Sequence, residues 1–128
     1  MALFYAFSWA QSKPLRIVFD VTSKDTLIHQ AAVRHVSAEA KAHPEGLFEV
    51  VIYSGALNMV VKDKSVVASG IQQLAGLKNV SFKVCSETMQ RYKVDKSQLL
   101  PGVDVVPDGI VEIVEKQGEG WGYIKEAH

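Results

Sequence analysis

Residues 15–21 are the stretch that most limits how this chain can fold. The segment is rich in β-branched and aromatic side chains, among them Ile17, Val18 and Phe19, as is typical of a strand buried on both faces. Such strands belong to sheets that helices cover from both sides. A turn follows, and Asp25 in it is a candidate N-cap for a helix. We therefore expect strands and helices to alternate along the chain.

The rest of the sequence continues this alternation. The first helix carries Ile28, Ala32, Val36 and Ala40 on one face and ends at residues 43–46. Further strands are expected at residues 47–53, 80–84, 103–106 and 121–124, and further helical segments at residues 59–61, 65–75, 86–93 and 108–118. Strands joined through helices predict a parallel sheet with right-handed crossovers. The predicted fold is a single-domain α/β three-layer sandwich with helices on both faces.

Two helix ends have more specific signals. Gly76 lies just beyond the helix at 65–75, where a left-handed cap residue is expected. Asp108 is a candidate cap for the helix at 108–118. For that helix we expect a buried stripe of Ile110, Ile113 and Val114, and an exposed face of Glu112, Glu115 and Lys116.

Composition excludes several classes of protein. The chain has 128 residues, enough for one domain with a real core, and its 48% hydrophobic and 22% charged residues fit neither a disordered chain nor a coiled coil. Fourteen basic and fourteen acidic residues balance, so no basic stripe indicates a nucleic-acid partner. The single cysteine excludes an intramolecular disulfide and a multi-cysteine metal site.

Residues 1–10 form an apolar segment that is too short to cross a bilayer. Small residues at Ser8 and Ala10 resemble the end of a signal peptide, although the charged n-region is missing. The alternative is an apolar arm that packs on a neighbouring subunit. We therefore divide the chain into residues 1–14, an apolar arm or signal-peptide remnant, and residues 15–128, the α/β domain. We expect a cytoplasmic protein, or one exported to the periplasm if residues 1–10 belong to a signal peptide.

Cys85 is the main candidate for a functional residue. Val80, Phe82 and Val84 alternate along the preceding strand, and the residues after Cys85 are suited to a helix start. The thiol is thus expected between the carboxyl end of a strand and the amino end of a helix, where open α/β sheets carry their sites and where a thiolate is stabilised. A nearby carboxylate at Glu87 disfavours the thiolate. The alternative is a buried cysteine that acts as a small hydrophobe.

Other motifs are weaker. Gly55 and Asn58 stand in a strand-to-helix turn that suits either an anion or an ordinary tight turn. His29, His35 and His43 lack the spacing of a zinc pair and are expected at the surface. No metal site or cofactor is predicted, and the absence of a Gly-x-Ser-x-Gly elbow argues against a serine hydrolase.

Three segments resemble the DsrE/DsrF-like, or YchN-like, family. They are a cysteine followed three residues later by Thr88, the Leu-Leu-Pro-Gly-Val and Val-Pro-x-Gly pattern at residues 99–109, and the Gln-x-x-Gly-Trp-x-Tyr-Ile pattern at residues 117–124. With the first strand and the Gly55 turn, the resemblance covers about residues 15–125. Two positions depart from the family pattern: Glu87 stands where asparagine is frequent, and Tyr53 and Ser54 precede Gly55 where a histidine is frequent.

The resemblance implies a mostly parallel five-stranded sheet and a homo-oligomer, as a trimer, hexamer or dimer. It also implies a sulfurtransferase or sulfur carrier, in which Cys85 holds sulfane sulfur as a persulfide and exchanges it with donor and acceptor proteins. Residues expected to assist at the site are Ser86, Glu87, Thr88, Gly55, Asn58 and Arg91. The rival hypothesis is a non-catalytic oligomeric module that binds a small anion or nucleotide, with Cys85 structural.

Overall fold

The computed structural model describes residues 13–127, so the expectations for residues 1–10 lie outside the described part. Its centre is a five-stranded sheet in the order β4-β3-β2-β1-β5, in which all neighbouring strands are parallel. The strands are β1 (Arg16–Val21), β2 (Leu47–Ile52), β3 (Val80–Cys85), β4 (Val103–Val106) and β5 (Gly122–Lys125). The predicted α/β fold with a parallel five-stranded sheet is confirmed.

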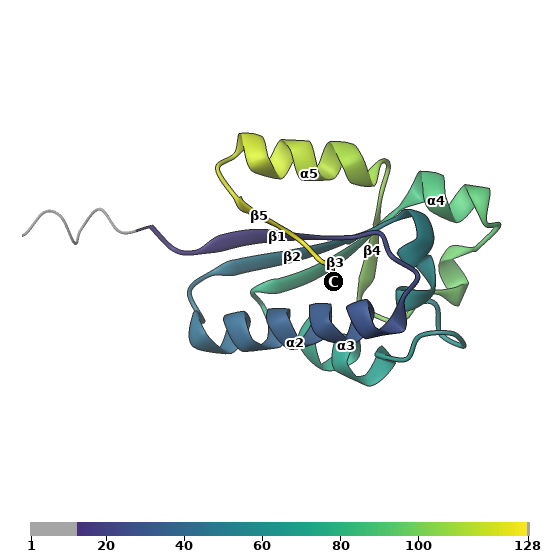
Figure 1. The fold of residues 1–128 in the computed structure, drawn as a ribbon, viewed down its shortest axis with the longest axis horizontal. Coiled ribbons are helices and arrows are strands. Elements are labelled where there is room, and N and C mark those ends of the chain that lie inside the picture. Colours follow the sequence, from purple (N-terminus) through teal and green to yellow (C-terminus); the bar gives the residue numbers. More distant parts are fainter. Residues whose placement is uncertain (1–12, 128) are drawn as a thin grey trace, which may run out of the picture.

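Helices cover the two faces of the sheet unequally (Figure 1). On one face lie α2 (Thr26–Ala42) and α3 (Ala68–Ala75), and on the other lies α5 (Gly109–Gly118). The shorter segments η1 (Ser54–Val60), α4 (Ser86–Arg91) and η2 (Lys96–Gln98) gather at the carboxyl ends of the strands. None of the helices in residues 13–127 has the length and apolar character needed to cross a membrane.

The face under α2 and α3 forms the main core. Period-two alternation sends Phe19, Phe48 and Phe82 toward these helices, where all three are buried together with Val36 and Ile71. Because these side chains come from three neighbouring strands and two helices, their packing fixes the parallel register of the centre of the sheet.

The face under α5 is mostly polar. Among residues 13–127, the buried apolar cluster there consists of Val18, Val51 and Ile113, with Tyr53 and Trp121 packed against it. The carboxylates of Asp20 and Glu49 are also buried on this side, and each has one oxygen without a hydrogen-bond partner. The two faces of one sheet therefore differ sharply in chemistry.

The orientation of α5 differs from the expectation. Ile113 is buried as predicted, but Ile110 is 58% exposed and Val114 is 61% exposed. Glu112 and Lys116, expected on the wet face, turn toward the sheet, where Lys116 lies 3.3 Å from Glu112 and 3.9 Å from Glu49. The reason is that the sheet beneath α5 presents the buried Glu49, whose carboxyl group hydrogen-bonds to Glu112 while Lys116 lies near both carboxyl groups.

Three local expectations are also wrong. The segment after β2 is the 3-10 helix η1 rather than a stretch centred on residues 59–61. Gly76 caps α3 in the right-handed region, with φ −78° and ψ −11°. His29 is buried rather than at the surface, because its Nε2 lies 2.7 Å from the carbonyl oxygen of Ser23 and this bond satisfies the ring inside the core. The predicted caps Asp25 and Asp108 do accept bonds from the first turns of α2 and α5.

Candidate functional site

Cys85 lies where the sequence predicted it. It is the last residue of β3 and the N-cap of α4. The residue is only 4% exposed, yet it lines a cavity of about 290 Å³ at the carboxyl ends of the strands. The cavity is lined by Tyr53, Ser54, Cys85, Glu87, Thr88, Arg91, Asp108 and Ile110. The predicted residues Glu87, Thr88 and Arg91 are therefore brought together with the thiol.

Gly109 brings the amino end of α5 against this cysteine. A Cβ at Gly109 would lie 3.3 Å from the Cβ of Cys85 and 3.2 Å from Cδ1 of Tyr53. Both distances are tighter than ordinary contacts, so a larger residue there would push the helix end away from the site. The amino ends of α4 and α5 thus meet at Cys85.

Thr88 lines the Cys85 cavity and also holds a neighbouring turn. Its buried hydroxyl accepts a hydrogen bond of 3.0 Å from the backbone N–H of Ser54. Ser54 has a φ of 56°, a conformation that residues other than glycine seldom adopt. Since this bond joins α4 to the start of η1, Thr88 holds the turn that follows β2.

The remaining predicted residues lie elsewhere. Gly55 and Asn58 line a neighbouring cavity and are absent from the lining of the Cys85 cavity. Ser86 faces along its own helix, where its Oγ accepts a bond of 3.3 Å from Nε2 of Gln90. Only Ser54 lines both cavities, so the strand-to-helix turn at Gly55 borders a second pocket and not the thiol itself.

Tyr53 is a site residue that sequence reasoning did not select. It follows β2, lines the Cys85 cavity and packs beside Gly109. Burial, together with the negative charge of Asp20, raises the pKa of Tyr53 to about 12, so its hydroxyl keeps its proton at neutral pH. The signal that was available is its position at the carboxyl end of a strand next to the cysteine-bearing strand.

Asp20, whose charge acts on Tyr53, is itself contacted by two side chains of β5. The hydroxyl of Tyr123 donates a hydrogen bond to Asp20, and the Nζ of Lys125 lies 3.6 Å from the same carboxylate oxygen. That hydrogen bond, followed by burial, raises the pKa of Tyr123 to about 12. Within the described residues, no group of three or more His, Cys, Asp or Glu side chains is arranged to hold a metal ion.

These features define a class of small α/β protein: a parallel sheet of order β4-β3-β2-β1-β5 with a cysteine at its carboxyl edge. The chain belongs to the DsrE/DsrF-like family, whose sequence pattern matches residues 17–125. The resemblance drawn from the three sequence segments is therefore confirmed.

Solved structures that are similar to this chain include two proteins. The protein of unknown function MTH1491 from Methanobacterium thermoautotrophicum is 33% identical, with a TM-score of 0.81 over 87% of this chain and 98% of its own. The YchN protein from E. coli is 13% identical, with a TM-score of 0.73 over 89% of this chain and 99% of its own, and it shows the shared fold. No curated protein matches the chain in a sequence comparison.

Proposed function

We propose that this protein carries sulfane sulfur as a persulfide on Cys85 and passes it to a thiol of a partner protein. The observation that carries the proposal is the lining of the Cys85 cavity, because the only cysteine of the chain borders open space at the carboxyl edge of the sheet. Membership of the DsrE/DsrF-like family supports the same chemistry at the coarser level of sulfur relay.

The reaction needs little more than an accessible sulfur. The Cys85 thiolate attacks the sulfane sulfur of a donor persulfide, a new S–S bond forms, and the donor leaves as a thiolate. In the second step an acceptor thiolate attacks the same sulfur and Cys85 leaves, so the two exchanges involve no net oxidation. Arg91 supplies a cation in the same cavity, which suits an anionic donor.

Intact-mass spectrometry tests this function directly. Incubation of the native protein with a persulfide donor is expected to add about 32 Da, reversibly with a reductant. Cys85→Ser is the matched control, because it removes the only thiol and leaves the cavity nearly the same size. No mass gain with any donor, in a protein whose thiol also resists labelling until it is denatured, would contradict the proposal.

One observation favours the rival function. Cys85 is 4% exposed, which suits a structural cysteine in a non-catalytic oligomeric module that binds a small anion or nucleotide. The labelling rate separates the two functions, since a carrier thiol reacts with a thiol reagent in the folded state and a structural thiol reacts only on unfolding.

We also propose that α5 mediates homo-oligomer assembly. Ile110, Val111 and Val114 form its outward apolar stripe, and each is about half exposed or more. A helix that turns charged side chains to its own sheet and apolar ones outward is suited to pack on a second copy of the chain.

Sedimentation velocity tests the assembly. Val111→Ser combined with Val114→Ser is expected to shift the protein to a smaller species, because neither side chain contributes to the core or lines the Cys85 cavity. Glu115→Ser, also exposed on α5, is the control and should leave the assembly unchanged. An unchanged sedimentation coefficient in the double variant would contradict this interface.

A further inference from the structure

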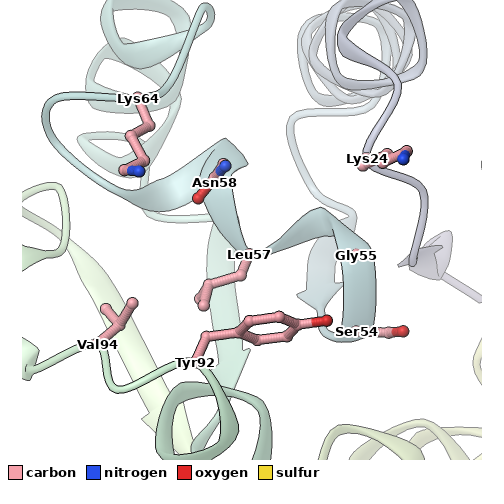
Figure 2. A pocket seen from close by; sticks show the side chains of 8 residues that line it. All are labelled: Lys24, Ser54, Gly55, Leu57, Asn58, Lys64, Tyr92 and Val94. Atoms are coloured by element: carbon pink, nitrogen blue, oxygen red, sulfur yellow. The ribbon is translucent and has the colours of Figure 1, made fainter.

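A second cavity lies beside the one that holds the thiol. Its volume is about 360 Å³, and it is lined by Lys24, Ser54, Gly55, Leu57, Asn58, Lys64, Tyr92 and Val94. Figure 2 shows Lys24 and Lys64 on opposite sides of Asn58, with Tyr92 extending below them toward Ser54. These side chains come from four separate parts of the chain: the loop after β1, η1, the segment after η1, and the segment after α4.

The lining of this cavity favours an organic anion. It contains two lysine side chains and an amide, and no acidic residue is among the described residues that line it. Lysine ammonium groups bind carboxylates and phosphates as point charges. Leu57, Val94 and the ring of Tyr92 give the same cavity an apolar wall, which suits the carbon skeleton of such a ligand.

Ser54 joins this cavity to the Cys85 cavity. It is exposed, it lines both cavities, and its left-handed backbone is held by the hydrogen bond from its N–H to Oγ1 of Thr88. Behind it, the chain is closely packed, because a Cβ at Gly55 would lie 3.0 Å from the carbonyl oxygen of Thr22. A molecule lying across Ser54 therefore has one end near the thiol and the other near the lysines.

We propose that the sulfur donor is a low-molecular-weight persulfide whose anionic groups bind between Lys24 and Lys64 while its sulfane sulfur reaches Cys85. This inference rests on the proposed function and names the substrate class of the same site. Two kinds of thiol have the required chemistry: a peptide thiol with carboxylates and a nucleotide thiol with phosphates.

The transfer step balances without another reactant. The Cys85 thiolate attacks the terminal sulfur of R–S–SH, the new bond joins that sulfur to Cys85, and the bond within the donor breaks. The electron pair of the broken bond leaves with R–S⁻, and the proton stays on the transferred sulfur. Lys24 and Lys64 hold R throughout and take no part in bond breaking, so they are positioning residues.

The experiment compares donors that carry anionic groups with one that carries none. The rate constant for loading Cys85 is measured by intact mass with the persulfides of glutathione, of coenzyme A and of 2-mercaptoethanol, which lacks carboxylates and phosphates. Lys24→Gln with Lys64→Gln is the test variant. Lys62→Gln with Lys78→Gln is the matched control, because both lysines are exposed, neither lines the cavity, and the net charge changes equally.

The test variant is expected to load about tenfold more slowly from the anionic donors, from the loss of two charge contacts in a partly open site. Loading from the 2-mercaptoethanol persulfide should stay within twofold of the unmodified protein, and the control variant should load normally from every donor. The anionic donor whose loading rate constant falls more in the test variant shows whether carboxylates or phosphates bind between the lysines.

The outcomes separate this inference from the proposed function. If the 2-mercaptoethanol persulfide loads Cys85 and the lysine substitutions leave the anionic donors unaffected, the substrate class is wrong and the carrier function stands. If no donor loads Cys85 and its thiol also resists labelling in the folded protein, the carrier function itself is wrong; if no donor loads but the thiol is labelled, only the substrate class is wrong. Binding of reduced glutathione or coenzyme A to Cys85→Ser, measured by calorimetry with and without the lysine substitutions, tests the subsite without any sulfur transfer. Equal binding to both forms overturns the subsite.

Discussion

The two faces of the sheet are built from alternate residues of the same strands, yet one is an apolar core and the other carries charged groups and the Cys85 cavity. Under α2 and α3, β2 and β3 contribute Val50, Ile52, Phe82 and Val84, all fully buried. Under α5, the same strands contribute Glu49, Lys83 and Cys85 among others. One face is apolar and buried on the central strands, while the other keeps charges and a cavity.

The contrast separates stability from chemistry. Burial of apolar side chains is the main favourable contribution to folding, so the face under α2 and α3 carries most of the stability. Buried carboxylates with unpartnered oxygens cost free energy, and the face under α5 holds two of them, Asp20 and Glu49. The apolar packing under α2 and α3 therefore offsets the free energy lost by burying these carboxyl groups under α5.

The largest effect is expected from Phe82→Ala, which truncates the apolar face at its centre. The ring is fully buried, so its removal leaves a cavity and should lower the free energy of unfolding by about 3–5 kcal/mol. Urea denaturation measures this loss. Glu115→Ala, on the exposed side of α5, is the control and should change stability by less than about 0.5 kcal/mol. Similar losses in both variants would remove the distinction between the faces.

A smaller effect is expected from pH, through the polar face. Burial, and then the sharing of its proton with Glu112, raises the pKa of Glu49 from 4.5 to about 8. The same proton sharing lowers the pKa of Glu112. Because the folded state holds the Glu49 proton more tightly than the unfolded chain, the stability from Glu49 is fully present below pH 4.5 and is lost as pH rises toward 8.

Denaturation midpoints between pH 5 and 8.5 test this slope. The loss should be on the order of 2 kcal/mol. The lowered pKa of Glu112 changes stability only below about pH 4.5, outside the measured range. Glu49→Gln should flatten the profile. Glu115→Gln, at an exposed position on α5, should leave it unchanged. A profile that Glu49→Gln does not alter would show that this carboxylate is not the cause.

The smallest effect is expected from Tyr123→Phe at the edge of the polar face. Loss of the hydroxyl removes the hydrogen bond to Asp20, whose other oxygen already lacks a partner, and should cost about 1 kcal/mol. Tyr92→Phe is the matched control, because Tyr92 is exposed. Thermal denaturation at neutral pH measures both, and an equal effect in the two variants would assign no stabilising role to the Asp20 contact.

The fold followed from the sequence wherever periodicity was unambiguous. All five strands and the helices α2, α3, α4 and α5 were expected close to their observed bounds, and Cys85 was expected at the junction of β3 and α4. These features depend on local patterns of apolar residues and caps, which a single sequence displays directly.

The predictions failed where tertiary contacts overruled local pattern. The apolar stripe of α5 suggested burial of Ile110 and Val114, but the buried Glu49 beneath the helix draws Glu112 and Lys116 inward. The separation of Asn58 from the thiol depends on the backbone of Ser54, whose positive φ has no signal in residue type. His29 is buried because its ring nitrogen Nε2 hydrogen-bonds to the carbonyl oxygen of Ser23, six residues earlier.

The outward stripe of α5 also affects how this protein can evolve. Val111 and Val114 add little to the core, so a change at either position is almost invisible to selection for folding. In the proposed assembly, the same change acts directly on the contact between copies of the chain. Two descendants of one ancestor can therefore keep the same Cys85 cavity and the same fold while they diverge in quaternary structure.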